Sequence, residues 1–283
     1  MRKIAAIDIG SNAVRMLICY VLMNEDEYFF QKNQYIRLPL RLGEDSFITG
    51  SISDDKINTL SNALLSFKHT MKVHGVEHYQ IYATSALRDS KNSNDVIKQI
   101  YDLTGMKIKL IDGLKEANVI AMGNPIEKLD VNKTYLYVDV GGGSTEYSIL
   151  RRGDDKKSKS FNIGTVRLIN NLFDESVFDE IKEWINENIE DDLKLKVFAT
   201  GGNINKIQDM TRTKSGKPIS YLSIKDLYNN LLEKDLNNRM IQYNLNPDRA
   251  DVIIPALKIF ISTMDWTNTV SYTHLTLPTI SSV

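Results

Sequence analysis

The feature that most constrains the fold of this chain is a short motif that occurs twice. An apolar run ends in an aspartate and a turn of small residues at positions 7–12 (IDIGSN) and again at 138–143 (VDVGGG). A second apolar run follows each copy, so each copy predicts a β-hairpin. At the same register Arg15 in the first hairpin corresponds to Glu146 in the second. The repeat predicts two similar lobes facing a shared cleft, with a boundary near residues 113–117.

Apolar runs and helical periods alternate along both halves of the chain, which predicts an α/β architecture. The expected strands are residues 4–9, 14–23, 79–83, 107–111, 135–140, 145–150 and 195–200. The expected helices are residues 54–74, 93–103, 114–122, 176–189, a segment after 203, 223–233, and 247–264 with a kink at Pro255.

Composition narrows the class of protein further. With 283 residues the chain is long enough for two cores, and its net charge of −1 provides no general attraction to nucleic acid or anionic lipid. The single cysteine, Cys19, excludes an internal disulfide or a cysteine zinc cluster and predicts the cytoplasm. Asp8 interrupts the first apolar run, which excludes a signal peptide, and the run 16–23 is too short to span a bilayer.

Three turns of small residues follow predicted strands. They are Gly10, Ser11 and Asn12; Gly141, Gly142, Gly143 and Ser144; and Gly201, Gly202 and Asn203. Such turns let the backbone approach a ligand and direct several N–H groups at it. One turn alone is best explained as a hairpin loop. Three at strand ends, two of them beside an aspartate, predict a polyphosphate-binding site, although none matches the P-loop or dinucleotide motif.

Acidic residues at strand ends predict a metal site. Asp8 and Asp139 lie in otherwise apolar runs, where a carboxylate is costly without a partner. Magnesium prefers oxygen ligands and bridges to substrate phosphates, so we predict that Asp139, Glu146 and Asp8 bind Mg²⁺. For a single aspartate, capping of the turn is an equally good explanation, but the matched pair favours the metal.

Two further residues are candidates for catalysis and phosphate binding. Glu116 begins a predicted helix and could activate water, although the helix dipole alone also favours an acid there. Arg88 follows a strand and a small polar turn, and arginine binds phosphate oxygens in a bidentate manner. The alternative for Arg88 is a surface pair with its neighbour Asp89.

These motifs, in this order, resemble the exopolyphosphatase / guanosine pentaphosphate phosphatase family in its short form. The resemblance extends from the start to about Trp266. The matching segments are 6–12 (AIDIGSN), 83–89 (ATSALRD), 113–117 (GLKEA), 138–146 (VDVGGGSTE), 164–168 (GTVRL), 201–202 (GG) and 249–253 (RADVI).

The resemblance implies two ribonuclease-H-like lobes of the actin-like ATPase fold, residues 1–116 and 117–270, with the site in the cleft between them. It implies that Glu116 is the base that activates water, and that Asp139 and Glu146 bind metal and position water. The implied phosphate-binding residues are Gly10, Ser11, Asn12, Arg88, Gly141, Gly142, Gly143, Ser144, Gly201 and Gly202. The implied reaction is Mg²⁺-assisted attack of water on a terminal phosphoryl group of polyphosphate or guanosine pentaphosphate.

The chain departs from the family pattern at two places. Lys115 replaces the first of two adjacent glutamates, and Glu116 is the second. Residues 271–283 (SYTHLTLPTISSV) resemble translated sequencing adapter, in place of a strand, a glycine turn and a helix. We therefore expect this tail to be non-native and to pack poorly, with a genuinely shortened C-terminus as the alternative.

Two other functions remain open from the sequence. One is an actin-fold kinase that transfers phosphate from ATP to a sugar or acetate, and the other is a non-catalytic regulator that binds guanosine nucleotides. We expect no nucleic acid polymer and no membrane as partner. A homodimer is possible because members of the family are often dimers.

Overall fold

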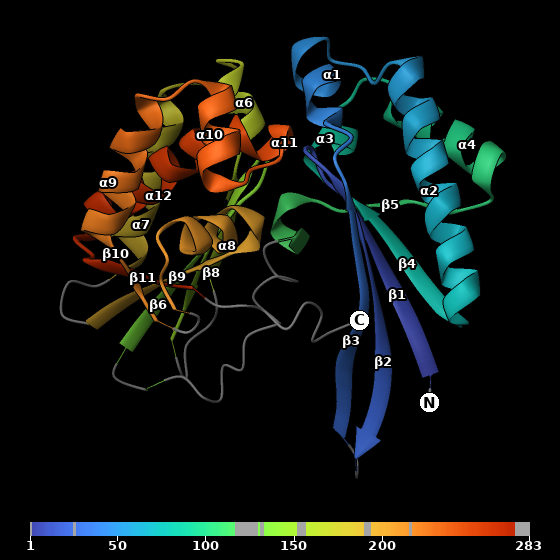
Figure 1. Cartoon of the computed structure of the whole chain (residues 1–283), viewed down its shortest axis with the longest axis horizontal. Helices are drawn as coiled ribbons and strands as arrows, with labels where there is room; N and C mark the ends of the chain where they lie inside the picture. Colours follow the sequence, from blue (N-terminus) through green and yellow to red (C-terminus); the bar gives the residue numbers. More distant parts are fainter. Residues whose placement is uncertain are drawn as a thin grey trace. The chain divides into compact units, whose positions relative to one another are not determined.

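A computed structural model of the chain describes residues 2–24, 27–116, 130, 133–151, 157–189, 194–214 and 217–274. The chain divides into two compact units, and the division falls between Asp112 and Gly113. The boundary expected from the sequence, after residue 116, lies slightly further along. Each unit has its own β-sheet (Figure 1). Each also has its own hydrophobic core.

The first unit contains a five-stranded sheet in the order β3-β2-β1-β4-β5. Strands β1 (Arg2–Ile9), β2 (Val14–Asn24) and β3 (Glu27–Leu38) form an antiparallel meander, and β4 (His78–Ala83) and β5 (Lys109–Leu110) extend it in parallel. The sequence did not predict β3. None of its side chains is fully buried: its first half is mostly exposed, and only Ile36 and Leu38 near its end pack half-buried against the core. The strand pairs with β2 along its length.

Two helices of this unit, α2 (Asp54–His74) and α4 (Ser93–Thr104), pack together beside the sheet (Figure 1). Ser53 caps α2 and Gly75 ends it in a left-handed conformation, as predicted. The cap of α4 is Asn92, one residue before the predicted one. The buried face of α2 has the predicted helical period and consists of Ile57, Leu60, Leu64, Phe67 and Met71. The short helices are α1 (Leu42–Ile48) and α3 (Ser85–Arg88).

The second unit contains a six-stranded sheet in the order β10-β11-β9-β6-β7-β8. Its strands are β6 (Lys133–Val140), β7 (Thr145–Leu150), β8 (Lys157–Phe161), β9 (Lys194–Thr200), β10 (Ile219–Ser220) and β11 (Ser271–His274). Strands β6, β7 and β8 are an antiparallel meander, and β9 and β11 continue from β6 in parallel. This arrangement repeats that of β1 to β5, so the predicted duplication extends to the whole ribonuclease-H-like sheet.

The helices of the second unit surround its core. They are α6 (Thr165–Ile169), α7 (Ser176–Asn188), α8 (Gly201–Met210), α9 (Tyr221–Leu232), α10 (Leu236–Tyr243), α11 (Pro247–Ala250) and α12 (Ile253–Thr267). The single kinked helix predicted over residues 247–264 is therefore wrong, because α11 and α12 are separate helices. Pro255 is the third residue of α12, and its ring would clash with the carbonyl of Asp251 if the helix continued backwards. Its missing N–H costs nothing in a first turn.

The expectation that the chain packs poorly from Ser271 onward is wrong for residues 271–274. Strand β11 pairs with β9 on one side and with β10 on the other, and so supplies the strand that was expected to be missing. Tyr272 is fully buried and packs edge to face against Phe260, with ring centroids 5.3 Å apart. The rest of the tail lies outside the described residues.

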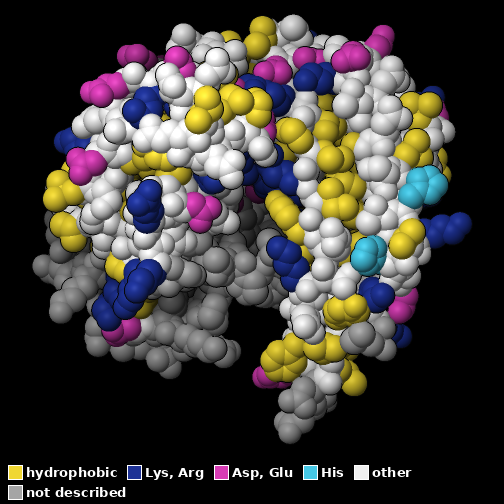
Figure 2. Space-filling model, viewed as in Figure 1, with side chains coloured by type: hydrophobic (Ala, Val, Ile, Leu, Met, Phe, Trp, Pro, Cys, Tyr) yellow, Lys and Arg dark blue, Asp and Glu magenta, His cyan; other side chains and the backbone are white. Residues whose placement is uncertain are grey.

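The β2–β3 hairpin extends beyond the strand that supports it. Strand β1 pairs with β2 only as far as Val21. Beyond that point the hairpin exposes apolar side chains, which Figure 2 shows at its outer end: Leu22, Met23, Tyr28 and Phe29.

Candidate active site

The first predicted phosphate loop, Gly10 to Asn12, joins β1 to β2. The N–H of Gly10 donates to the carbonyl three residues further on, at 3.1 Å, which closes the turn. The N–H of Arg41 donates to the Asn12 carbonyl at 3.0 Å, and that of Gly43 to the Ser11 carbonyl at 2.8 Å. A Cβ at Gly43 would lie 3.0 Å from that of Ser11. The start of α1 therefore fixes the carbonyl side of this loop.

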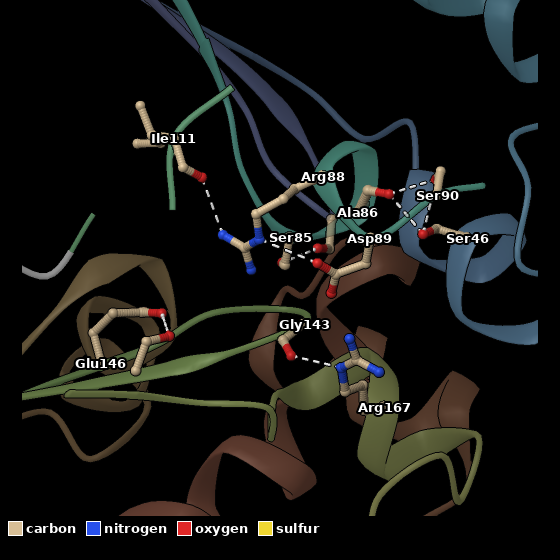
Figure 3. Close-up of polar contacts among 12 residues, drawn as sticks. Ser46, Ser85, Ala86, Arg88, Asp89, Ser90, Ile111, Gly143, Glu146 and Arg167 are labelled. Atoms are coloured by element: carbon tan, nitrogen blue, oxygen red, sulfur yellow. Dashed lines mark hydrogen bonds and ion pairs between the residues drawn. The ribbon is translucent and has the colours of Figure 1, made fainter. Parts of the chain in front are cut away.

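Arg88 is held at the ends of β4 and β5. Its Nε donates to Asp89 Oδ1 and its NH1 to the Ile111 carbonyl, both at 3.1 Å (Figure 3). The pair with Asp89, the alternative from the sequence, is thus present, but the contact with Ile111 also fixes the side chain against the sheet. Nearby, the hydroxyls of Ser85 and Ser11 are 2.9 Å apart and buried, which joins α3 to the first loop.

Asp8 has a cationic neighbour. It lies opposite Arg15 across β1 and β2, and Arg15 NH1 is 3.0 Å from Asp8 Oδ2. Desolvation raises the pKa of the Asp8 carboxyl, and the Arg15 charge acts in the opposite direction. The Asp8 side chain keeps 43% of its exposure, so water offsets part of the desolvation. Since Arg15 competes with any cation for this carboxylate, metal binding by Asp8 stays a prediction.

The second predicted phosphate loop, Gly141 to Ser144, joins β6 to β7. Two N–H groups at the start of α6, those of Thr165 and Val166, donate to carbonyls of the loop at 3.0 and 2.8 Å. The side chain of Arg167 donates to the Gly143 carbonyl at 2.8 Å (Figure 3). A Cβ at Gly164 would lie 2.5 Å from the loop backbone. N–H groups at the start of α6 thus bind the carbonyls of this loop, just as N–H groups near the start of α1 bind the carbonyls of the first loop.

Three N–H groups of this second loop make no bond among the described residues. In the part of the chain that the structure describes, the N–H groups of Gly142, Gly143 and Ser144 donate to no protein acceptor. Consecutive backbone N–H groups in a glycine turn form a concave site for anions. This arrangement supports the prediction that the loop binds phosphate oxygens.

Asp139 and Glu146 form an acidic pair beside the second loop. They lie directly opposite each other in the register of β6 and β7, so their side chains share one face of the sheet. Glu146 is 4% exposed, and the hydroxyl of Ser160 on β8 donates to its Oε1 at 2.9 Å. In Figure 3 this bond appears at Glu146. The two acids are therefore placed by strand pairing.

The third predicted loop, at Gly201 and Gly202, is instead the first turn of α8, with Thr200 as its cap. Gly201 has a φ of +92°, and a Cβ there would overlap Asp139 Oδ1. A Cβ at Gly202 would overlap the guanidinium of Arg249. Gly201 thus leaves room for the Asp139 carboxylate at the helix N-terminus, where the dipole favours it, and Gly202 leaves room for the Arg249 side chain. Phosphate binding by them stays a prediction.

Glu116 lies in the first turn of a helix, as predicted. Residues 113–116 are helical, and the rest of the predicted helix, 117–122, lies outside the described residues. Gly113, which begins the turn, is packed against Ser160: a Cβ at Gly113 would lie 2.5 Å from Ser160 Cβ and 2.6 Å from its Oγ. The segment that carries Glu116 therefore packs against Ser160, the residue that is hydrogen-bonded to Glu146.

The second unit brings together Glu146, Asp139, the glycine loop and the start of the Glu116 helix. Asp8, Arg88 and the first loop belong to the first unit. Their convergence with the acids of the second unit stays a prediction, because each unit is described by itself. Among the described residues no group of three or more histidine, cysteine, aspartate or glutamate side chains is placed to hold a metal.

Sequence reasoning missed several residues that support this site. Arg167 stands in a segment that matched the family, but nothing in its spacing indicated a contact with the glycine loop. Ser160 gave no signal, since it is one serine in a charged stretch. Asn203, which the sequence placed in the third turn of small residues, instead donates to the Val140 carbonyl at 2.9 Å and accepts from Arg249 at 3.0 Å, and so ties α8 to β6.

Two ribonuclease-H-like units, each with an aspartate beside a small-residue loop, define a protein of the actin-like ATPase fold. The chain belongs to the Ppx/GppA phosphatase family, which it matches over residues 23–273. It is 31% identical to the bifunctional 3-dehydroquinate synthase/phosphatase of Fusobacterium nucleatum, over 93% of this chain and 43% of that protein. It is 26% identical to a putative exopolyphosphatase of Haemophilus influenzae, over 94% of this chain and 85% of that protein.

A further relative is the guanosine-5'-triphosphate,3'-diphosphate pyrophosphatase of Photobacterium profundum, 24% identical over 95% of this chain and 56% of that protein. Among solved structures, an exopolyphosphatase from Cytophaga hutchinsonii has a TM-score of 0.83 and 22% identity, over 96% of this chain and 93% of that one. A Ppx/GppA protein of Aquifex aeolicus has a TM-score of 0.70 and 22% identity, with the same coverages. These structures establish the fold.

Proposed function

We propose that this chain is a hydrolase that releases terminal orthophosphate from inorganic polyphosphate or guanosine pentaphosphate, with water as the acceptor. The observation that carries the proposal is the pair Asp139 and Glu146, opposite each other beside a glycine loop, three of whose N–H groups have no acceptor among the described residues. Acids beside anion-binding donors suit transfer of a phosphoryl group to water. The names of the exopolyphosphatase and pyrophosphatase relatives support this choice of substrates.

Each group of residues has a separate role in the proposed hydrolysis. The N–H groups of the second loop bind oxygens of the terminal phosphoryl group and stabilise the charge that develops on them. Glu116 accepts a proton from the attacking water, and the buried Glu146 orients that water. Arg88 and the first loop, in the other unit, bind the remaining phosphates of the substrate.

The acidic pair suits Mg²⁺. Asp139 and Glu146 place carboxylates on one face of the sheet, and Mg²⁺ usually takes one or two carboxylates together with substrate phosphates and water. A set of two acids therefore fits, although no larger cluster occurs among the described residues. When bound, the ion would offset the negative charge of the phosphate oxygens. Asp8 remains a predicted third ligand.

The decisive experiment is a phosphate-release assay with long-chain polyphosphate and, separately, with guanosine pentaphosphate, with and without Mg²⁺. We expect orthophosphate release that depends on Mg²⁺ and shortens polyphosphate from its ends. Internal cuts, or no release with any divalent ion, would contradict the proposal. Transfer from ATP to a sugar or acetate would indicate a kinase, and tight nucleotide binding without turnover would indicate a regulator.

We also propose a cytoplasmic location and a homodimer. A chain whose only cysteine, Cys19, is buried and free suits a reducing compartment. Among the described residues, no helix combines the length and the apolar character needed to cross a membrane. Light scattering of the purified chain tests the dimer, since a monomeric mass would contradict it.

A further inference from the structure

Ser160 contacts two parts of the site at once. It lies on β8 directly opposite Glu146 on β7, and its hydroxyl donates to Glu146 Oε1 at 2.9 Å. Its Cβ and Oγ also occupy the space that a side chain at Gly113 would need, at 2.5 and 2.6 Å. Gly113 begins the helical turn that ends at Glu116. The two acids of the proposed reaction are thus joined through one serine.

The hydrogen bond restricts a carboxylate that is almost completely buried. A donor aimed at one carboxylate oxygen fixes the rotation of the group and leaves the direction of its other oxygen defined. Without that donor the carboxylate loses one restraint on its orientation toward water and substrate. Misplacement of a reacting group by about 1 Å can lower the rate by about 10²-fold.

The contact with Gly113 restricts the second acid. Gly113 has no side chain, so its backbone approaches Ser160 closely, and the three residues that follow carry the chain to Glu116. A shift of Ser160 therefore moves the start of this helical turn. Backbone contact positions Glu116, whereas hydrogen bonding positions Glu146.

We propose that Ser160 is a positioning residue that sets the Glu146 carboxylate by its hydroxyl and the Glu116 helix by its contact with Gly113. This inference rests on the proposed hydrolase function. Ser160 does not itself touch the reacting atoms. It acts on the rate of the chemical step through the two glutamates.

The test compares Ser160→Ala with Ser158→Ala. Ser158 is two residues earlier on β8, on the same face, and its hydroxyl makes a matched cross-strand bond of 2.8 Å to Ser148, away from the acids. We expect Ser160→Ala to lower kcat for polyphosphate by about 10- to 100-fold with little change in KM. Ser158→Ala should leave kcat near the wild-type value, and the two variants should have similar thermal unfolding midpoints.

Equal kcat values for Ser160→Ala and Ser158→Ala, with an active wild-type chain, would overturn the role of the hydroxyl. If Ser160→Ala unfolds, Ser160→Cys provides the measurement, because it keeps Cβ and a weaker donor; its kcat should fall well below wild type while KM holds. A wild-type chain that releases no phosphate would instead contradict the proposed function, and this inference with it.

A second pair of variants tests the contact with Gly113. Gly113→Ala should lower kcat, because the new Cβ collides with Ser160. Combining it with Ser160→Gly removes the atoms that it strikes, so the double variant should recover kcat relative to Gly113→Ala alone. The double variant should stay below wild type, since it lacks the hydroxyl. No recovery would show that Ser160 does not seat the Glu116 helix.

Discussion

Asp8 and Arg15 face each other across β1 and β2 with their charged atoms 3.0 Å apart, whereas the same two hairpin positions in the second unit hold Asp139 and Glu146. The backbone register is identical in the two copies, but the charges differ. In the first pair the arginine offsets the charge of the aspartate. In the second pair both charges are negative, and a bound cation would stabilise them. The two copies therefore share the hairpin, but only the second places two acids opposite each other, which is the pair proposed to hold Mg²⁺.

The Asp8–Arg15 pair should contribute little to stability. Both side chains are more than a third exposed, at 43% and 37%, so solvent screens their attraction. We expect Arg15→Gln to lower the free energy of unfolding by less than about 1 kcal/mol in denaturant titrations. The same change at Arg2, 77% exposed and 3.8 Å from Glu77, should have no measurable effect. A large loss at Arg15 would show that the pair has a structural role.

Glu116→Gln should abolish turnover and spare substrate binding. Glutamine keeps the shape of the side chain but cannot accept the proton, so kcat should fall by roughly 10²- to 10⁴-fold. Phosphate release measures the first effect and equilibrium binding of polyphosphate the second. Glu183→Gln, at an exposed position of α7, is the control. Near-normal turnover in Glu116→Gln would mean that Glu116 only stabilises the start of its helix.

Asp139→Asn should raise the Mg²⁺ concentration needed for activity. An amide retains one oxygen ligand but removes the negative charge that attracts the ion. The measurement is phosphate release as a function of Mg²⁺, with Asp226→Asn on the exposed face of α9 as the control. An unchanged Mg²⁺ requirement would remove Asp139 from the proposed metal site.

Gly201→Ala should be more harmful than Gly75→Ala. Both glycines have positive φ, +92° and +66°, where an L-residue costs roughly 1–2 kcal/mol. A Cβ at Gly75 meets nothing within 4 Å, whereas at Gly201 it overlaps the Asp139 carboxylate. We expect Gly75→Ala to keep its activity, and Gly201→Ala to lose more stability and also activity. Equal unfolding midpoints and equal kcat values for the two variants would contradict this geometry.

Tyr272→Ala should destabilise the chain strongly. The ring is fully buried and packs against Phe260, on a strand paired with β9 and β10, so its removal should cost about 3–5 kcal/mol in the free energy of unfolding. Tyr28→Ala, at a side chain 65% exposed on the edge strand β3, should change it by no more than about 0.5 kcal/mol. If the two variants have the same free energy of unfolding, β11 is not part of the sheet in solution.

Local pattern determined the hairpins, the glycine loops and the capped helix α2. These features depend on residues within about ten positions of one another, so hydrophobic period and turn chemistry are sufficient to predict them. The register that places Glu146 opposite Asp139 also follows from the repeat, because a four-residue loop of fixed length joins the two strands. Local pattern made Glu116 and Arg88 candidates, each with a structural alternative, and the resemblance to a family favoured their proposed roles.

Tertiary structure alone decided the rest. Strand β3 has no fully buried side chain, and β11 enters the sheet between strands that are distant in the sequence, so local pattern did not place either strand in its sheet. From the sequence, Gly201 and Gly202 were predicted to form a loop. They begin a helix instead, and the reason for glycine at these two positions is the close approach of Asp139 and Arg249, which only the folded structure shows. The bond from Ser160 to Glu146, and the seat that Ser160 forms for Gly113, depend on three segments meeting in the folded chain. Contacts of this kind arise from packing between elements, which short-range sequence patterns do not encode.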